Sequence, residues 1–431
     1  MPTWEDRHVV AHCHGRAAPR WQPAVALVAA AVLALTVGAA AEQPASATGG
    51  YTVTGTIEVG TGPDGVAVDP TSHTTYVTDI DDDSVSVIDE ATKTVTATIT
   101  VGGGPLTVAA DPTSHIVYVT NGGNGTVSVI NEATGTVTAT IPVGHGPDGV
   151  AMDSTSHLAY VANGGDGTVS VVNGATDAVV ATVRVGSHPY SIAANAKTGK
   201  VYVTHTYGNE LSVLDGANNT ATQLKTGSHD LIAIDDKTDT IYLLGYESGT
   251  VSVVNGEHQT VRLKQAGNHA WGLAIDEQTG TLYAARIETA QVAEFASDSS
   301  LPRYLPSGAI PCAIAMNRRA DVLYISNYGE NSVSAVHVRD GHRIATVAVG
   351  DHPKAIAFDA GRNLVYVANT LAGTVTVIDA ATNTVIATLP AGKNPYALAV
   401  VPGSSKLYVA NEWDAEASTT VDLSEIRVSQ Q

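Results

Sequence analysis

Three histidines, His188, His229 and His269, recur along the chain at intervals of roughly 40 residues. Two of them are followed two positions later by an aromatic residue, Tyr190 and Trp271. Neutral imidazoles combined with a carboxylate can hold a divalent cation, and an imidazole beside a metal or a guanidinium can act as a general base. The pattern therefore predicts a ligand-binding surface or a metal-dependent centre, if the fold brings these residues to one face.

A second group of unusual residues follows later in the same three stretches. Elsewhere in the chain the corresponding place carries an asparagine, as at Asn121 and Asn163, but it becomes His205 and Arg286 here, and Glu247 follows close by. We therefore expect one candidate ligand-binding set, in which the possible ligands of a divalent metal (Mg²⁺ or Ca²⁺) are His229, His269 and Glu247. The full set is His188, Tyr190, His205, His229, Glu247, His269, Trp271 and Arg286. The alternative interpretation is that these are loop side chains, solvated or hydrogen-bonded to a neighbouring turn.

Other polar residues favour structural roles. His73, His115 and His157 each end a Thr-Ser-His segment and are interpreted as ordinary turn residues. The run Asp79-Ile-Asp-Asp-Asp could bind Ca²⁺, but it lacks EF-hand spacing and favours a solvated acidic loop. Asparagines such as Asn121 are expected to cap turns by bonding to the backbone. Cys312 is interpreted as a small side chain that packs in the fold and not as a reactive thiol.

These residues lie in a chain built from repeats of about 42 residues. Val101 to Ile141 is followed by a near copy that begins at Val143. A tyrosine marks each copy, and a small residue stands nine positions before it. The tyrosines are Tyr76, Tyr118, Tyr160, Tyr202, Tyr242, Tyr283, Tyr324, Tyr366 and Tyr408. Nine copies are counted, with eight as the alternative if one of the weak copies between Gly227 and Ser307 is an insertion.

Each copy predicts four short antiparallel strands joined by turns rich in Gly, Asn, Asp and Pro. In the second copy they are expected at Thr107–Ala110, Ile116–Thr120, Thr126–Ile130 and Thr136–Ile141. Four strands per repeat predict an all-β fold, a β-propeller of four-stranded blades. The loop entering strand one and the loop from strand two to three then share one face, which we call the top. Loops from strand one to two lie on the bottom.

The two ends of the repeat array predict how the ring closes. Thr52–Gly60 matches the fourth-strand segments but stands before the first full copy. The last copy has a plausible third strand at Ser418–Leu423 and then nearly runs out. We therefore expect the N-terminal strand to complete the last blade, which would cover two exposed edges. Glu425–Ser429 could compete for that place.

Composition narrows the classes of function. The chain has 431 residues and a net charge of −20, which argues against nucleic acid as a partner. Arg7, Arg16 and Arg20 precede an apolar run, Ala24 to Ala40, and small residues follow, as in an export signal. We expect residues 1–47 to be a signal peptide with a short linker and 48–431 to be one propeller domain, with an uncleaved anchor as the alternative. The chain has two cysteines, and Cys13 precedes the apolar run. The exported part would therefore contain Cys312 alone and no intramolecular disulfide.

The boxes Tyr118-Val-Thr-Asn and Tyr366-Val-Ala-Asn, with Val-Gly-x-x-Pro loops, resemble the YVTN-family β-propellers. The resemblance implies a secreted or surface protein of bacterial type. It carries no catalytic residues over to this chain. The first hypothesis is an extracytoplasmic monomer that binds a small molecule or a partner protein on its top face without chemistry. The alternative is a metal-dependent lyase or hydrolase of a lactone or cyclic ester that uses His and Glu of repeats four to six. A redox subunit with a cofactor in the channel is a third reading.

Overall fold

The computed structural model describes residues 51–428, except 58, 70, 90, 93, 207, 228–230, 236–237, 246–247, 277, 401–405 and 412–422. The expected signal segment, residues 1–47, lies outside this part of the chain. Within the described residues, no helix has the length and apolarity that a membrane crossing requires.

The described residues form nine four-stranded antiparallel sheets. Sheets one to three contain β2 (Pro63–Asp69), β3 (Thr74–Asp79), β4 (Ser84–Asp89), β5 (Thr94–Thr100); β6 (Pro105–Asp111), β7 (Ile116–Asn121), β8 (Thr126–Asn131), β9 (Thr136–Pro142); and β10 (Pro147–Asp153), β11 (Leu158–Asn163), β12 (Thr168–Asn173), β13 (Ala178–Arg184). Sheets four to six contain β14 (Pro189–Asn195), β15 (Lys200–His205), β16 (Glu210–Asp215), β17 (Thr220–Lys225); β18 (Leu231–Asp235), β19 (Thr240–Leu244), β20 (Thr250–Asn255), β21 (Thr260–Gln265); and β22 (Ala270–Asp276), β23 (Thr281–Arg286), β24 (Gln291–Phe295), β25 (Arg303–Pro306). Sheets seven to nine contain β26 (Pro311–Asn317), β27 (Val322–Asn327), β28 (Ser332–His337), β29 (Arg343–Ala348); β30 (Pro353–Asp359), β31 (Leu364–Asn369), β32 (Thr374–Asp379), β33 (Thr384–Pro390); and β34 (Pro395–Val400), β35 (Lys406–Asn411), β36 (Leu423–Val428), β1 (Tyr51–Ile57).

The second repeat shows how the sequence sets the strand register. All four predicted strands are present. β7, β8 and β9 each end one residue later than predicted, and β6 begins two residues earlier and ends one residue later. Pro105 at the start of β6 lies opposite Asn121 at the end of β7, and Ala109 lies opposite Tyr118. The loop that enters the first strand and the loop that leaves the second therefore share one face, as predicted for the top.

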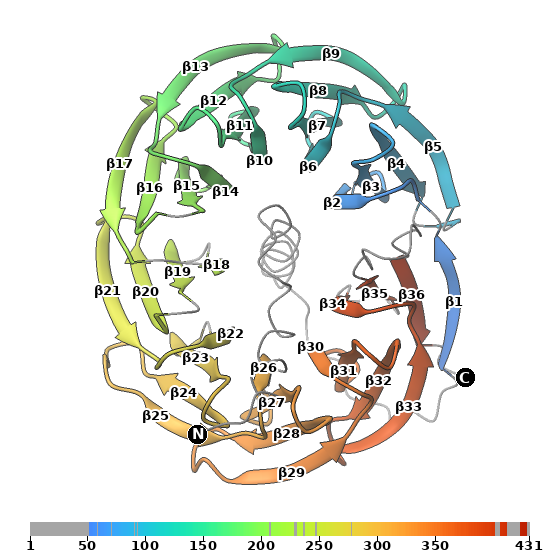
Figure 1. The fold of residues 1–431 in the computed structure, drawn as a ribbon, viewed down its shortest axis with the longest axis vertical. Helices are drawn as coiled ribbons and strands as arrows, with labels where there is room; N and C mark the ends of the chain where they lie inside the picture. Colours follow the sequence, from blue (N-terminus) through green and yellow to red (C-terminus); the bar gives the residue numbers. More distant parts are fainter. Residues whose placement is uncertain are drawn as a thin grey trace, which may run out of the picture.

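The core lies between neighbouring sheets rather than at one centre. Tyr118 and Val129 of repeat two pack with Val150, Val161 and Val172 of repeat three in one buried cluster. Burying a side chain of this size contributes about 1.5–3 kcal/mol, so each sheet is held mainly by its two neighbours. The small residue on each first strand suits this arrangement because the first strands lie innermost (Figure 1).

Figure 1 shows the sheets placed in chain order around a common centre, with β1 on the outside next to β36. The predicted pairing of the N-terminal strand with the last repeat is present, since Tyr51 lies opposite Val428 and Ile57 opposite Leu423. Of the predicted third strand at Ser418–Leu423, residues 418–422 lie outside the described part of the chain. Among the described residues the third place is taken by β36, Leu423–Val428, which lies later in the chain than predicted. Glu425–Ser429 was expected as a competitor for the fourth strand of this sheet, but residues 425–428 belong to β36, its third strand. β36 pairs with β35 on one edge and leaves the other edge for β1.

Candidate functional site

The histidines before the first strands occupy a backbone position that requires a left-handed conformation. The φ angle is 50° at His188, 55° at His269 and 54° at His352, and Gly62, Gly104 and Gly146 are also positive there. His188 and His269 use their carbonyls to accept the amides of Thr206 and Ile287, at 3.1 Å in both cases. Because glycine, asparagine, aspartate and histidine tolerate positive φ best, the recurrence of histidine here has a conformational explanation.

His205 takes over the structural role of the repeat asparagine. In repeat two, Asn121 Nδ2 donates to Thr126 Oγ1 and Ser128 Oγ, both at 3.0 Å. His205 is buried; its Nδ1 lies 2.9 Å from the Ser187 carbonyl and its Nε2 lies 2.9 Å from Ser212 Oγ. Burial lowers the pKa of His205, so the ring is neutral at physiological pH. A buried, fully paired neutral imidazole does not serve as a surface ligand.

The asparagines themselves differ in part from the prediction. Their amide nitrogens bond to side-chain hydroxyls, as in the bonds from Asn163 Nδ2 to Thr168 Oγ1 and Ser170 Oγ at 3.0 Å. In Asn163 and Asn327 the Oδ1 atom also accepts from the backbone, from Gly144 N at 3.1 Å and from Gly308 N at 2.8 Å. The Oδ1 atoms of Asn121 and Asn369 have no hydrogen-bond partner among the described residues. They join strand two to strand three and to the entry loop, and they do more than cap their own turn.

Arg286 is the second substitute at this place. Its Nη1 donates to Gln291 Oε1 at 2.9 Å, which repeats the bond to the residue five positions on that Asn121 makes to Thr126. The guanidinium also lies 4.6 Å from the centre of the Tyr304 ring. These contacts tie Arg286 to its own sheet, so it stiffens repeat six.

His269 and Trp271 are the other residues of the predicted ligand-binding set for which contacts are described. His269 Nδ1 lies 2.6 Å from Glu288 Oε1, and the two side chains are 33% and 52% exposed. Trp271 is partly buried against a small apolar cluster made of Ile287, Cys312 and Tyr328. The top face therefore carries an aromatic side chain beside a histidine–carboxylate pair, which suits a ligand with an apolar body and a polar edge.

The same surface continues into repeats seven and eight. The Tyr328 ring meets the His352 ring edge-on at 4.4 Å between centroids, and His352 Nδ1 lies 2.9 Å from Asp351 Oδ1. Glu288, Tyr328, His352 and Asp351 were absent from the predicted set. His352 occupies the same entry-loop position as His188 and His269, whereas Glu288, Tyr328 and Asp351 occupy loop positions at which the residue type differs between repeats.

Not all of the predicted set can be placed. His229 and Glu247 lie outside the described residues, so the metal hypothesis for them and His269 stays a prediction. His188 is exposed and Tyr190 partly buried, both in repeat four, whereas Trp271 packs on repeat seven. The candidate site is therefore centred on repeats six to eight in the described part of the chain.

The second residue of the first strand varies most in chemistry around the top face. It is Trp271 in repeat six but Asp64 in repeat one and Asp148 in repeat three. Burial and the charge of Asp148 raise the pKa of Asp64 to about 7, and burial raises the pKa of Asp148 to about 6. The two acids were not singled out from sequence, although they share the Pro-Asp-Gly motif.

The aspartate run in repeat one has ordinary structural partners. Asp79 is buried, stands where other repeats have asparagine, and accepts from Ser86 Oγ at 2.7 Å. Asp82 Oδ2 accepts from Thr61 N at 2.6 Å, and Asp83 Oδ1 accepts from Gly104 N at 2.8 Å. These carboxylates fix neighbouring top loops, which supports the structural interpretation of the run over a Ca²⁺ site.

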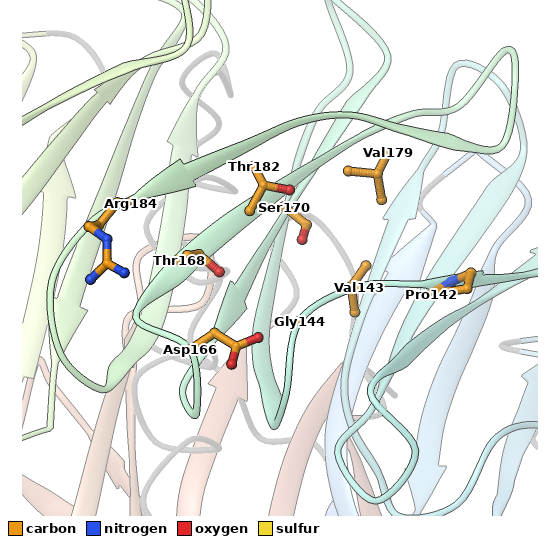
Figure 2. Close-up of a pocket in the computed structure, with 9 residues that line it drawn as sticks. All are labelled: Pro142, Val143, Gly144, Asp166, Thr168, Ser170, Val179, Thr182 and Arg184. Atoms are coloured by element: carbon orange, nitrogen blue, oxygen red, sulfur yellow. The ribbon is translucent and has the colours of Figure 1, made fainter.

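A groove of about 460 Å³ runs along the outer side of the fold between repeats two and three (Figure 2). It is lined by Pro142, Val143, Gly144, Asp166, Thr168, Ser170, Val179, Thr182 and Arg184. Its acidic residue is already engaged, since Asp166 Oδ1 lies 2.8 Å from His145 Nδ1 and Asp166 Oδ2 accepts from His145 N at 2.8 Å. The groove lies on outer strands and its acidic residue is already paired with His145, so it is a weaker candidate than the top face.

Comparison with known proteins identifies the fold and no more. No family model matches the chain. No curated protein matches it either. Among solved structures, the dihydro-heme d1 dehydrogenase NirN in complex with DHE is similar with a TM-score of 0.52 and 11% identity, over 76% of this chain and 75% of that one. The Kuenenia stuttgartiensis hydrazine synthase is similar with a TM-score of 0.44 and 19% identity, over 77% of this chain and 99% of that one. The first of these supports a propeller-like all-β fold.

Proposed function

We propose that the chain is an exported nine-bladed β-propeller of YVTN type, with β1 as the outer strand of the ninth blade. Support comes from the nine four-stranded sheets, from the pairing of β1 with β36, and from the export-like N-terminus. A test compares a chain that starts at residue 51 with one that starts at 59. Loss of β1 should lower the denaturation midpoint because the edge of β36 loses its partner strand and becomes exposed. Equal midpoints would contradict closure by β1.

We infer that this propeller binds a small ligand or a partner protein through the top face of repeats six to eight, without chemistry of its own. One observation carries the proposal: Trp271, partly exposed, sits on the buried Ile287, Cys312 and Tyr328 beside the His269–Glu288 pair. A rigid aromatic residue anchored in this way is typical of binding hot spots. The corresponding residue of repeat two is the aliphatic Leu106.

The test is a ligand-observed NMR screen of the full chain against a soluble small-molecule library, followed by titration of each hit. Trp271→Leu is the main variant, because leucine already occupies this place in repeat two. Binding should weaken at least tenfold in Trp271→Leu and in His269→Ala, and it should be unchanged in the matched control Leu106→Ala. Ligands whose binding is unchanged in Trp271→Leu but lost in Leu106→Ala would contradict this placement of the site. A partner protein would be tested with the same three variants.

A further inference from the structure

A cluster of three ionisable side chains lies on the bottom face, between repeats one and two and away from the top-face site. Asp69 ends β2, His115 lies in the turn between β6 and β7, and Glu132 lies in the turn between β8 and β9. Within the described part of the chain, these are the one group of three His, Cys, Asp or Glu residues whose ligand atoms all lie within 4.8 Å of one another. The backbone holds two of them together, because Glu132 N donates to the His115 carbonyl at 3.1 Å.

The carboxylates are buried and aim unused oxygen atoms into the cluster. Asp69 is fully buried, and its Oδ1 already accepts from Thr71 N at 2.7 Å and from Thr71 Oγ1 at 2.6 Å. Asp69 Oδ2 and Glu132 Oε1 are both buried without a hydrogen-bond partner among the described residues. The Glu132 side chain is 6% exposed, whereas His115 is 55% exposed. Buried carboxylate oxygens without partners are costly, so the fold leaves a demand for positive charge here.

The distances suit a shared cation better than direct hydrogen bonds. His115 Nδ1 lies 3.6 Å from Asp69 Oδ2 and 3.3 Å from Glu132 Oε2. Hydrogen bonds of this kind span about 2.7–3.2 Å. Ligand atoms placed about 2.0–2.1 Å from a tetrahedral Zn²⁺ lie roughly 3.3 Å from one another. The exposed imidazole edge leaves water a route to the fourth position.

The next interface provides an internal comparison in the same chain. Asp111 and His157 correspond to Asp69 and His115, but Gly174 stands in the place of Glu132. There, His157 Nδ1 lies 2.9 Å from Asp111 Oδ2, within the range of an ordinary hydrogen bond. With one carboxylate fewer, imidazole and carboxylate approach each other directly. The wider spacing at the first interface therefore accompanies the added glutamate.

We propose that Asp69, His115 and Glu132 bind one divalent transition-metal ion, Zn²⁺ in the first instance, which links repeat one to repeat two. The one-nitrogen, two-oxygen ligand set favours Zn²⁺ over Ca²⁺, which prefers oxygen ligands alone. Bound to the folded state only, the ion stabilises the junction between the two repeats. The competing account is that the two carboxyl groups share a proton, since burial and the neighbouring Asp69 raise the pKa of Glu132 to about 7.

The test measures Zn²⁺ bound per chain by equilibrium dialysis and elemental analysis, using the full chain without a histidine tag. Residues His8, His12, Cys13 and His14 could bind zinc independently, so the readout is the difference between wild type and variants. Glu132→Gly copies the arrangement that repeat three already tolerates, and Glu132→Gln keeps the shape of the side chain. Both variants and His115→Ala should bind one ion fewer per chain than wild type. The matched control His157→Ala should bind as much as wild type.

Two further readouts do not depend on the zinc count. Added Zn²⁺ should raise the melting temperature of wild type and of His157→Ala, and it should not raise that of Glu132→Gly. Co²⁺ in place of Zn²⁺ should give tetrahedral visible absorption bands in wild type that are absent in Glu132→Gly. Equal zinc content in wild type and Glu132→Gly, or equal losses in His115→Ala and His157→Ala, would overturn the proposal. A folded Glu132→Gln that melts at the wild-type temperature, with no zinc difference, would favour the shared proton.

Discussion

His205 provides a sharp test of whether a divergent residue in the repeats is structural or functional. Replacing it with alanine removes two buried contacts, one to the Ser187 carbonyl and one to Ser212 Oγ, each at 2.9 Å. A buried hydrogen bond contributes about 0.5–1.5 kcal/mol, and a buried polar group left without a partner costs about 1–3 kcal/mol. His205→Ala should therefore lower the free energy of unfolding by about 2–4 kcal/mol. His205→Asn, which restores the residue of the other repeats, should cost less than about 1 kcal/mol.

The pH dependence gives the same prediction an independent readout. Burial lowers the pKa of His205 in the folded state, so below its ordinary value the unfolded chain binds more protons than the folded one. The stability that depends on neutral His205 is complete above about pH 6.5, the ordinary value, and is lost as the pH falls below it. The free energy of unfolding of wild type minus that of His205→Asn should therefore be constant above pH 7 and should decrease towards pH 5.

The assay is equilibrium urea denaturation followed by circular dichroism, at pH 7.5 and pH 5.5, on wild type, His205→Ala and His205→Asn. Midpoints are compared at each pH, since long repeat arrays can depart from two-state unfolding. A His205→Ala protein as stable as wild type would refute the structural assignment. It would return His205 to the candidate ligand set, as would a difference between wild type and His205→Asn that does not change with pH.

Three further predictions use matched positions in the repeats. Tyr202→Phe should lower the free energy of unfolding by about 1–2 kcal/mol, because it removes the 2.8 Å hydrogen bond from the tyrosine hydroxyl to Asp239 Oδ1. Tyr118→Phe should leave the free energy of unfolding unchanged, because the buried Tyr118 hydroxyl has no partner among the described residues. Midpoints of urea denaturation compare the two variants. Gly167→Ala should destabilise the protein by more than Gly135→Ala in the same assay, because both have positive φ but only the Gly167 Cβ would meet a carbonyl, Gly186 O, at 2.5 Å. Asp64→Asn should stabilise the protein at pH 8 and not at pH 4. Burial and Asp148 raise the pKa of Asp64 from 3.8 to about 7, so the unfolded chain loses this proton at a lower pH than the folded chain does. The resulting loss of stability begins above about pH 3.8 and is complete above about pH 7, which thermal melts at both pH values test.

The repeats made most of the fold predictable because each turn fixes the register of its own hairpin. The marker pair Ala109 and Tyr118, read from spacing alone, lies directly opposite across β6 and β7. Prediction failed where the repeat pattern ends. The segment before β36 carries no marker, so the third strand of repeat nine was placed too early.

The candidate sites were less predictable, since they depend on contacts between repeats. His188 and His269 were predicted to be ligand-binding residues, but their position also requires a positive φ angle. Gly62 and Gly146, which occupy the same position in other repeats, already indicated this constraint. Conversely, His115 was interpreted as a turn residue, which its φ of 56° supports. Its approach to Asp69 of the preceding repeat depends on how two sheets pack, and spacing along one chain does not determine that.

The most direct measurement of the proposed function is hydrogen–deuterium exchange of the full chain, with and without a ligand found by the NMR screen. Protection should be concentrated on the top face, in the loops at residues 266–271, 286–290, 308–312 and 327–330. The bottom-face turns at residues 112–115 and 132–135 should be unchanged. Protection confined to those bottom turns, or to the outer groove around Thr182, would contradict the assignment of the binding site to the Trp271 surface.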